Sequence, residues 1–407
     1  MQISNKNLIS YSLLAFCLSF MGLPLYIYLP NYYADNFGVT LQNIAIILFV
    51  TRLIDAVQDP IFGIFSYKYS YLKRKIICYL SPFMGLSFLL LFYPLDIINI
   101  HLWLIIFLVI SFSLFSAVYI NYQSYSVAFS EDYHTKTKII AYREFAFISG
   151  IIFAALIPAI LFKIFDEVTS FLIVGISYFI LATIFSIIFY FFAPKNLYQN
   201  NQESDFKELF SNKILKKFSI IFLFNAVSSA IPAVLLIFFV EKVLVAKDLL
   251  GIFLLLYFVG LMIGAIFWTK LSKILDNKSR TWLISMFLTL FVFGFCYFLE
   301  EGDILFYGLI CIFSGIGFGG DFALAYSILT DIIQKYKLQD EQTIIFGICN
   351  FIVKISLTLA SSILIYFVGF FENDTILQTE FISFSYALLP IFFRAFAGLT
   401  LFRNFKK

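Results

Sequence analysis

The sequence predicts an all-α integral membrane protein with twelve transmembrane helices in two halves of six. Hydrophobic residues make up 61% of the 407 residues and charged residues only 13%, whereas a soluble domain has about 25% charged residues. Apolar stretches of the length needed to cross a bilayer, about 20 residues, recur along the chain. We therefore expect an N-terminal six-helix bundle (1–193), a cytoplasmic central loop (194–217) and a C-terminal six-helix bundle (218–407).

Counting the apolar stretches from the N-terminus gives twelve expected spans. The first follows Lys6 and could be taken for a signal peptide, but it is too long and lacks a small-residue cleavage site. We interpret it as a span. The expected spans are residues 8–32, 40–66, 76–94, 102–127, 139–162, 169–193, 218–241, 249–271, 281–299, 304–333, 344–371 and 376–402.

The placement of lysine and arginine predicts the orientation, because cytoplasmic loops of membrane proteins carry an excess of both. With both termini inside, the inner segments hold 21 of these residues and the outer loops hold only Lys163, Lys242 and Lys247. We therefore expect both termini to be cytoplasmic. Basic loops after the second and eighth spans also favour a two-half transporter, in which the substrate site lies at the membrane midplane between the halves.

The second span carries the feature on which the functional prediction depends. Asp55 and Asp59 are four residues apart and point from one helix face, with Arg52 one turn earlier and Gln58 at the border of that face. A charge at the membrane midplane costs at least about 2.5 kcal/mol, so such groups face a bundle interior or a water-filled path and often mark an ion pathway. The alternative is an Arg52–Asp55 pair that only locks helices together, with Asp59 near the membrane surface.

Two further spans contain polar groups far from their ends. Asn121, Ser124 and Tyr125 lie on one face of the fourth span. They could bind a cation or sugar hydroxyls, or they could form hydrogen bonds between helices. Lys354 lies well inside the eleventh span, with Asn350 four residues earlier on the same face. We expect Lys354 to face an internal cavity, near a carboxylate or an anionic part of the substrate.

Charged residues near the inner ends of spans need no functional role. Arg143 and Glu144 lie just inside the fifth span and can snorkel, with their charged groups at the inner surface. We expect the same of Arg394 in the last span. In the tenth span, Asp331 lies near the inner end and can pair with a loop lysine, whereas Asp321 lies deeper.

The tenth span also contains GIGFGG at residues 315–320, which satisfies the GxGxxG pattern of dinucleotide-binding folds. That interpretation requires a preceding strand and a βαβ unit, and an apolar span provides neither. We expect close helix packing or a flexible point instead. In the seventh span, Asn225, Ser228, Ser229 and Pro232 predict a polar segment that can kink.

The segment RLIDAVQDP at residues 52–60 resembles the second-span signature of the glycoside–pentoside–hexuronide cation symporters. These are the melibiose permease-like members of the major facilitator superfamily. The likeness covers nearly the whole chain and extends to YYAD at residues 32–35, Gly38, YREF at residues 142–145, Asn225 with Pro232, and Asp331 with Lys354. It implies the major facilitator fold and a transporter that needs no cofactor.

By this resemblance, Asp55, Gln58 and Asp59 bind the coupling cation together with a fourth-span residue. The family has an acid at that fourth-span position, where this chain has Asn121. An amide oxygen can still coordinate Na⁺, but the site loses one negative charge, so Na⁺ and H⁺ are both candidates. Arg52 and Asp321 belong to the surrounding charge network, and no metal other than Na⁺ is expected.

The resemblance also implies a set of substrate contacts. In melibiose permeases a first-span aspartate binds galactosyl hydroxyls, and this chain has Ser19 at that position. We therefore do not expect the substrate to be a galactoside. Asp321 is an acid that could take over part of that role. The implied substrate-binding residues are Tyr26, Tyr125, Arg143, Phe322, Asn350 and Lys354.

We predict a monomeric secondary active transporter of a bacterial inner membrane that takes up a sugar or glycoside with Na⁺ or H⁺ by alternating access. The alternative cargo is a lysolipid or another amphiphile, because relatives of the family carry lysolipids. We expect no nucleic-acid partner. An enzyme is not expected, because two histidines and five isolated cysteines offer neither a catalytic base with its nucleophile nor a set of metal ligands.

Overall fold

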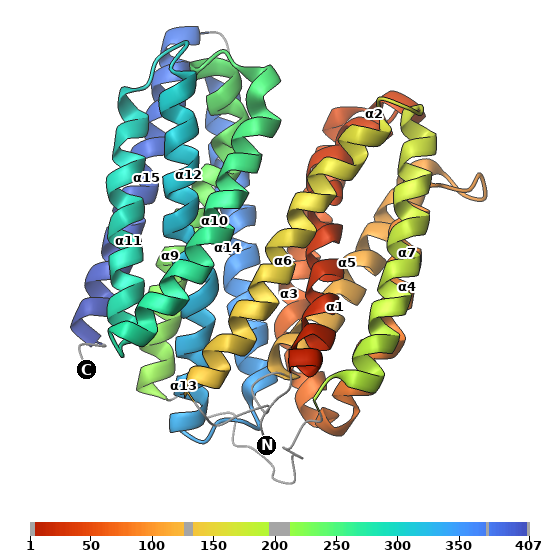
Figure 1. Ribbon diagram of the computed structural model, residues 1–407. Coiled ribbons are helices and arrows are strands. Elements are labelled where there is room, and N and C mark those ends of the chain that lie inside the picture. Colours follow the sequence, from red (N-terminus) through yellow and green to blue (C-terminus); the bar gives the residue numbers. More distant parts are fainter. Residues whose placement is uncertain (1–4, 126–132, 195–211, 372–373, 405–407) are drawn as a thin grey trace. The chain divides into compact units, whose positions relative to one another are not determined.

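The computed structural model describes residues 5–125, 133–194, 212–371 and 374–404 (Figure 1). These residues form helices joined by turns, and none of them lies in a β-strand. The all-α prediction is therefore confirmed. Most of the expected central loop, residues 194–217, lies outside the described residues, and the next helix begins at Lys213.

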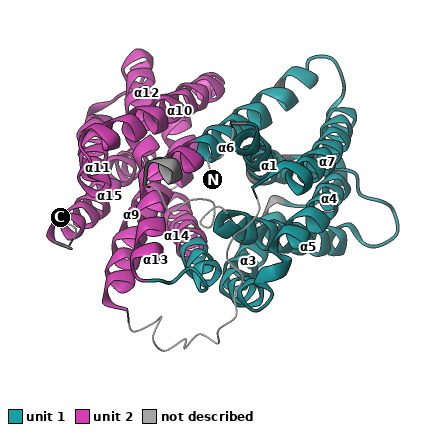
Figure 2. Cartoon of the chain, turned by 60° about the horizontal axis from the view of Figure 1, so that its bottom comes forward, with its two compact units in different colours: residues 1–132, 142–204, 337–351 teal, residues 133–141, 205–336, 352–407 magenta. Residues whose placement is uncertain are grey.

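The chain divides into two compact units (Figure 2). Unit 1 comprises residues 1–132, 142–204 and 337–351, and unit 2 comprises residues 133–141, 205–336 and 352–407. The division therefore falls within two helices, one near residue 141 and one near residue 351.

In unit 1, α4 packs against both α5 and α7, α3 against α5, and α1 against α7. Polar caps fix two of the helix starts: Thr40 accepts a hydrogen bond from the Asn43 N–H, and Asp166 accepts one from the Thr169 N–H. The elements are α1 (Asn5–Leu23), η1 (Pro24–Tyr28), α2 (Leu29–Phe37), α3 (Leu41–Lys68), η2 (Ser70–Leu72), α4 (Lys73–Phe92), α5 (Ile100–Tyr125), α6 (Tyr133–Leu161) and α7 (Glu167–Phe192).

In unit 2, α10 packs against α12, α9 against α15, and α11 against both α12 and α15. A π-helical segment, η7, interrupts the tenth expected span where α12 meets α13. The elements are α9 (Lys213–Phe238), η4 (Phe239–Val243), η5 (Lys247–Leu249), α10 (Leu250–Ile274), α11 (Lys278–Gly294), η6 (Phe295–Phe298), α12 (Ile304–Gly320), η7 (Asp321–Ala325), α13 (Tyr326–Lys335), α14 (Gln342–Phe370) and α15 (Thr375–Asn404).

Eleven helices of the described chain are long and apolar enough to cross a membrane. The second expected span is α3, whose 28 residues suffice in length. It is not among the eleven because its apolar stretch carries Arg52, Asp55 and Asp59. Asp55 and Asp59 belong to the predicted cation site, and Arg52 belongs to the predicted charge network around it.

The glycines of α12 serve helix packing, as expected from the sequence. A methyl group added at Gly315 would lie 2.2 Å from the Tyr257 carbonyl oxygen of α10, and one added at Gly319 would lie 2.5 Å from the Ala265 nitrogen. Gly264 of α10 approaches the Ile316 carbonyl equally closely, at 2.2 Å. Only glycine allows two helix backbones to approach this closely.

Candidate functional site

The acidic face of α3 is turned inward. Asp55 is 3% exposed and Asp59 is fully buried, whereas Leu53, Ile54 and Val57 on the remaining face are exposed. This division follows from the helical repeat, because residues four apart share a face. A buried carboxylate is tolerated only where polar groups or opposite charges compensate it.

Helix α5 supplies polar partners to the acidic face of α3. Ser116 donates a hydrogen bond to Asp55, with Oγ 2.8 Å from Oδ1. Three residues earlier, Ser113 donates to the side-chain oxygen of Gln58 at 2.7 Å. The two serines are i and i+3 on α5, so they present their hydroxyls side by side to α3.

Asn121 lies on the same helix, further toward its C-terminal end. Its side-chain oxygen accepts a hydrogen bond from Ser66 of α3 at 2.5 Å, and its amide nitrogen donates to the Ala117 carbonyl at 2.7 Å. The structure thus places Asp55, Gln58 and Asn121 along the α3–α5 contact, and Asp59, on the same face of α3 as Asp55, is buried. The group offers carboxylate, amide and hydroxyl oxygens, which are the ligands that hard cations prefer. Among the described residues there is no group of three His, Cys, Asp or Glu that could hold a metal ion.

The first part of α14, which belongs to unit 1, covers α3 at Asp59. A methyl group on Gly347 would lie 2.7 Å from the Asp59 carbonyl oxygen, and one on Gly63 would lie 2.9 Å from the Thr343 carbonyl oxygen. Asn350 follows on α14 and donates a hydrogen bond to the side-chain oxygen of Gln123 at 3.2 Å. This contact brings one predicted substrate residue to the helix that carries Asn121.

Arg143 and Glu144 do not snorkel, which corrects the expectation from their position in the span. They are 3% and 4% exposed and form an ion pair, with Arg143 Nε 2.8 Å from Glu144 Oε1. Both residues interact electrostatically with Tyr119 of α5, which also interacts with Asp59. The pair is therefore part of the buried polar interior of unit 1.

The remaining predicted site residues lie on α5, η7, α14, α3 and η1. The Tyr125 hydroxyl donates to the Pro194 carbonyl at 3.0 Å, at the end of α5. Phe322 and Lys354 are half-buried and belong to unit 2. Arg52 is half-buried on α3, and the side chain of Tyr26, in η1, lies outside what the structure describes.

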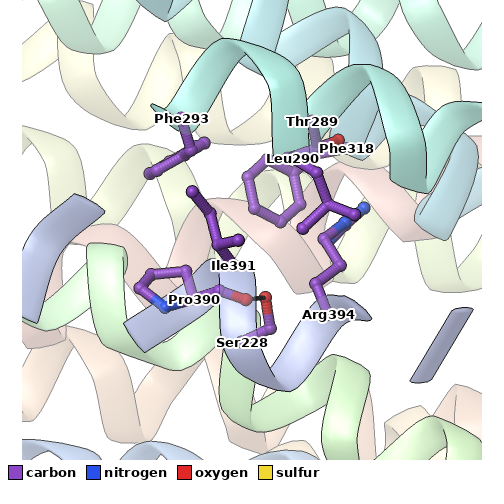
Figure 3. A pocket seen from close by; sticks show the side chains of 8 residues that line it. All are labelled: Ser228, Thr289, Leu290, Phe293, Phe318, Pro390, Ile391 and Arg394. Atoms are coloured by element: carbon purple, nitrogen blue, oxygen red, sulfur yellow. Dashed lines mark hydrogen bonds between the residues drawn. The ribbon is translucent and has the colours of Figure 1, made fainter. Parts of the chain in front are cut away.

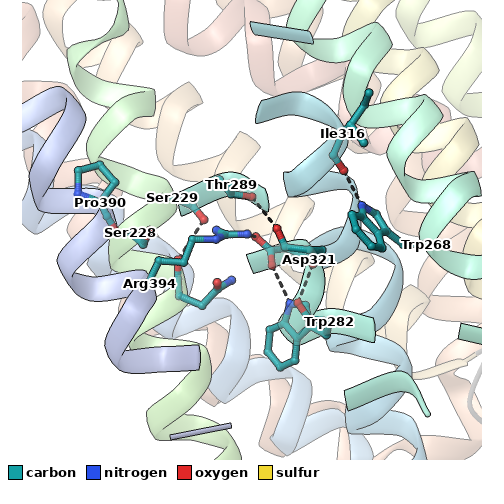
Figure 4. A network of polar contacts seen from close by, with 11 residues as sticks. Ser228, Ser229, Trp268, Trp282, Thr289, Ile316, Asp321, Pro390 and Arg394 are labelled. Carbon is teal, nitrogen blue, oxygen red and sulfur yellow. Dashed lines mark hydrogen bonds and ion pairs between the residues drawn. The ribbon is translucent and has the colours of Figure 1, made fainter. Parts of the chain in front are cut away.

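A second buried charge network lies in unit 2 (Figure 4). Asp321, the first residue of η7, accepts a hydrogen bond from the Trp282 indole at 2.7 Å and forms an ion pair with Arg394, whose Nη2 lies 2.8 Å from Oδ2. Arg394 is 1% exposed, and its guanidinium stacks over the Phe318 ring at 4.4 Å from the centroid. The expectation that Arg394 snorkels was therefore wrong, because Asp321 and Phe318 hold its side chain inside unit 2.

Near this network, α9, α11, α12 and α15 leave a narrow crevice, too narrow for a water molecule (Figure 3). It is lined by Ser228, Thr289, Leu290, Phe293, Phe318, Pro390, Ile391 and Arg394.

Asp331 forms an ion pair with Lys278 at the start of α11, with Nζ 2.6 Å from Oδ2. The expectation that Asp331 pairs with a loop lysine is confirmed. Lys278 is almost fully buried.

Sequence reasoning missed the serines of α5 that serve the acidic face. The one signal in the sequence is that Ser113 and Ser116 are three residues apart in an apolar span, which predicts that both lie on the same helix face. The sequence does not show that these serines contact α3. The spacing of residues along one helix indicates a polar face but not the neighbouring helix that this face contacts.

The solved structures similar to this chain include a bacterial homologue of the iron transporter ferroportin in its outward-facing state. That structure has 11% sequence identity, covers 99% of each chain and gives a TM-score of 0.77. The same homologue, outward-facing and soaked with iron, covers 98% of this chain and 99% of its own, again at 11% identity, with a TM-score of 0.73. At this identity the likeness concerns the fold alone.

No curated protein sequence matches the chain. A family model, described as MFS/sugar transport protein, matches residues 10–406. The match and the helical membrane fold indicate a transporter and not an enzyme. The chain belongs to the MFS/sugar transport protein family, the melibiose permease-like branch of the major facilitator superfamily.

Proposed function

We propose that the protein is a secondary active transporter that couples the movement of a sugar or glycoside to that of Na⁺ or H⁺. Membership of the sugar transport family supports the transporter class. The observation that carries the coupling is the buried acidic face of α3, where Asp55 is held by Ser116 and Asp59 is fully buried.

The coupling follows from electrostatics and linkage. Two carboxylates buried on one helix face favour a bound cation or proton that neutralises them. If the neutralised site stabilises the conformation that binds substrate, cation binding raises the affinity for substrate, and substrate raises the affinity for the cation by the same factor. The substrate then crosses when the transporter changes which side of the membrane it faces.

The cation site comprises Asp55, Gln58, Asp59 and Asn121, with the serine hydroxyls of α5 as further oxygen donors. With Asn121 in place of an acid, the cation site carries one negative charge fewer than in the family. H⁺ and Na⁺ are therefore both candidates for the coupling cation. The distribution of lysine and arginine supports cytoplasmic termini. We propose a monomer of a bacterial inner membrane that binds no cofactor.

Uptake into proteoliposomes tests this function. The purified protein is given radiolabelled neutral glycosides under an imposed Na⁺ gradient and, separately, under an imposed H⁺ gradient. Accumulation driven by one of the two gradients identifies the coupling cation. Absence of accumulation of any glycoside under either gradient contradicts the proposal.

A lysolipid or another amphiphile is the second candidate cargo. The observation that favours it is an apolar groove of about 540 Å³ in unit 2. It is lined by apolar side chains from α11 to α12, five of them phenylalanines, and by Asp303. A groove of this kind can hold an acyl chain. If a labelled lysolipid, and no glycoside, is taken up in the same assay, this candidate replaces the first.

A further inference from the structure

Several buried polar side chains of unit 2 have hydrogen-bonding groups that no described residue satisfies, namely those of Arg394, Asn225 and the serines Ser327, Ser356 and Ser385. Arg394 uses Nη2 for Asp321, but its Nε and Nη1 have no hydrogen-bond partner among the described residues. The same holds for the side-chain oxygen of Asn225, which is 5% exposed. An unmade hydrogen bond of a buried polar group is unfavourable, and such groups in a folded protein need an explanation.

The register of α9 and α15 places Asn225 and Arg394 at the same level of unit 2. The two helices run antiparallel, because the Phe224 ring contacts Phe396 at 4.3 Å while the Ser228 hydroxyl donates to the Pro390 carbonyl at 2.9 Å. Asn225 lies between Phe224 and Ser228, and Arg394 lies between Pro390 and Phe396. The unpaired donors of Arg394 and the unpaired acceptor of Asn225 therefore lie on two neighbouring helices.

The face of α9 that carries Asn225 is directed toward the charge network. Phe218, Phe222 and Asn225 share one helix face. The Phe218 ring lies 6.4 Å from the ring of Trp282, and Trp282 is the residue whose indole donates to Asp321. Asn225, Asp321 and Arg394 therefore converge from α9, η7 and α15.

Asp321 is the more accessible member of its ion pair. The Asp321 side chain is 11% exposed, against 1% for Arg394. Asp321 also begins the π-helical segment η7, and π-helical turns inside α-helices occur frequently at functional sites. The crevice of Figure 3 does not serve as an entry, because it is too narrow for a water molecule.

The charge of the network selects the ligand class. Asp321 and Arg394 neutralise each other, so a neutral ligand leaves the buried site neutral, whereas an anion or a cation adds an uncompensated buried charge. A hydroxyl group can accept from Arg394 and donate to the Asn225 oxygen at once, and further hydroxyls can donate to the Asp321 carboxylate. We propose that Asn225, Asp321 and Arg394 form a binding subsite for a neutral polyhydroxylated group such as a sugar ring.

This inference rests on the proposed transport function, and it adds Asn225 and Arg394 to the substrate contacts that the family resemblance implies. Ligand-induced thermal stabilisation of the full-length protein in detergent tests it without any ion gradient. The probes are neutral methyl hexosides and methyl pentosides, with the corresponding uronates as anionic counterparts. A ligand that binds the folded state raises the melting temperature in a concentration-dependent manner.

Asn225→Leu keeps the size of the side chain and removes the acceptor, and Arg394→Lys keeps the charge and removes the guanidinium donors. We expect the best neutral sugar to bind about 3- to 10-fold more weakly to Asn225→Leu, and at least about 10-fold more weakly to Arg394→Lys. Asp331→Asn, which breaks the Lys278–Asp331 ion pair of unit 2, is the matched control and should keep the affinity of the wild type. Each variant is compared with its own melting temperature without sugar.

Three results overturn the inference: stabilisation by uronates that exceeds that by neutral sugars, unchanged affinity in both Asn225→Leu and Arg394→Lys, or no stabilisation of the wild type by any sugar of the panel. Failure of cation coupling leaves a different signature, because sugar stabilisation would then persist while gradient-driven uptake is absent. The two failures are therefore distinguishable.

Discussion

The hydroxyl of Ser116 donates a hydrogen bond to the carboxylate of Asp55, with 2.8 Å between Oγ and Oδ1. This bond joins α5 to the acidic face of α3 and fixes the orientation of one of the two carboxylates to which we assign cation binding. A carboxylate held in a fixed orientation loses less entropy when it binds a cation.

Replacement of Ser116 by alanine should weaken Na⁺ binding without abolishing it. The change removes the hydroxyl that orients the Asp55 carboxylate and that serves as a further oxygen donor to the cation. Where Na⁺ is the coupling cation, we expect the Na⁺ concentration that gives half-maximal uptake to rise about 3- to 10-fold. Ser111→Ala is the matched control, since Ser111 lies on the same helix and donates to Ser87 instead. An equal shift in both variants would remove Ser116 from the site.

Loss of one member of the Asp321–Arg394 pair should be more damaging than loss of both charges. Arg394→Met leaves the Asp321 carboxylate without its opposite charge, and breaking a buried pair in this way costs about 3–5 kcal/mol. The double variant Asp321→Asn with Arg394→Met removes both charges and should recover part of that stability. Melting temperatures in detergent check the order, and a double variant less stable than Arg394→Met would contradict it.

Alanine substitutions at two glycines should differ in their effect on stability, because one glycine lies in a tight helix contact and the other does not. Gly264→Ala brings a methyl group to 2.2 Å from the Ile316 carbonyl oxygen, so α10 and α12 must move apart. Overpacking of this kind costs about 1–3 kcal/mol. Gly308→Ala meets only the Leu256 side chain, at 3.5 Å, and should be neutral or mildly stabilising. Similar melting temperatures for the two variants would show that the α10–α12 contact is not tight.

The capping aspartate of α7 should make stability depend on pH. Hydrogen bonds from the backbone N–H and the hydroxyl of Thr169 hold the pKa of Asp166 below its usual value. Because the pKa is lower in the folded state, this stabilisation is present above the unfolded-state pKa and is lost as the pH falls through the folded-state pKa. Asp166→Asn keeps a capping side chain that does not titrate. Its melting temperature should depend less on pH in the acidic range, and identical pH profiles would contradict this role.

The fold could be predicted from the sequence because a bilayer imposes long apolar helices, and their number and length are visible in the chain. The inward turn of Asp55 and Asp59 was equally predictable, since their spacing places them on one face. The pairing of Asp331 with a lysine followed from its position near the end of a span.

The partners of the remaining charges could not be predicted. Arg394 pairs with Asp321, which is 73 residues away along the chain, and hydropathy does not indicate which helices become neighbours. An arginine near the end of a span can either snorkel to the membrane surface or be buried in an ion pair, and its position in the sequence does not distinguish the two. The difference arises only when an acid on another helix lies within reach.

Comparison of wild type with Asp59→Cys in proteoliposomes tests the central claim most directly. The substrate is a labelled glycoside, measured both for uphill accumulation under a cation gradient and for exchange without a gradient. We predict that Asp59→Cys loses uphill accumulation and retains some exchange, because the variant still binds substrate but no longer couples it to the cation. Full uphill accumulation by Asp59→Cys would contradict the account.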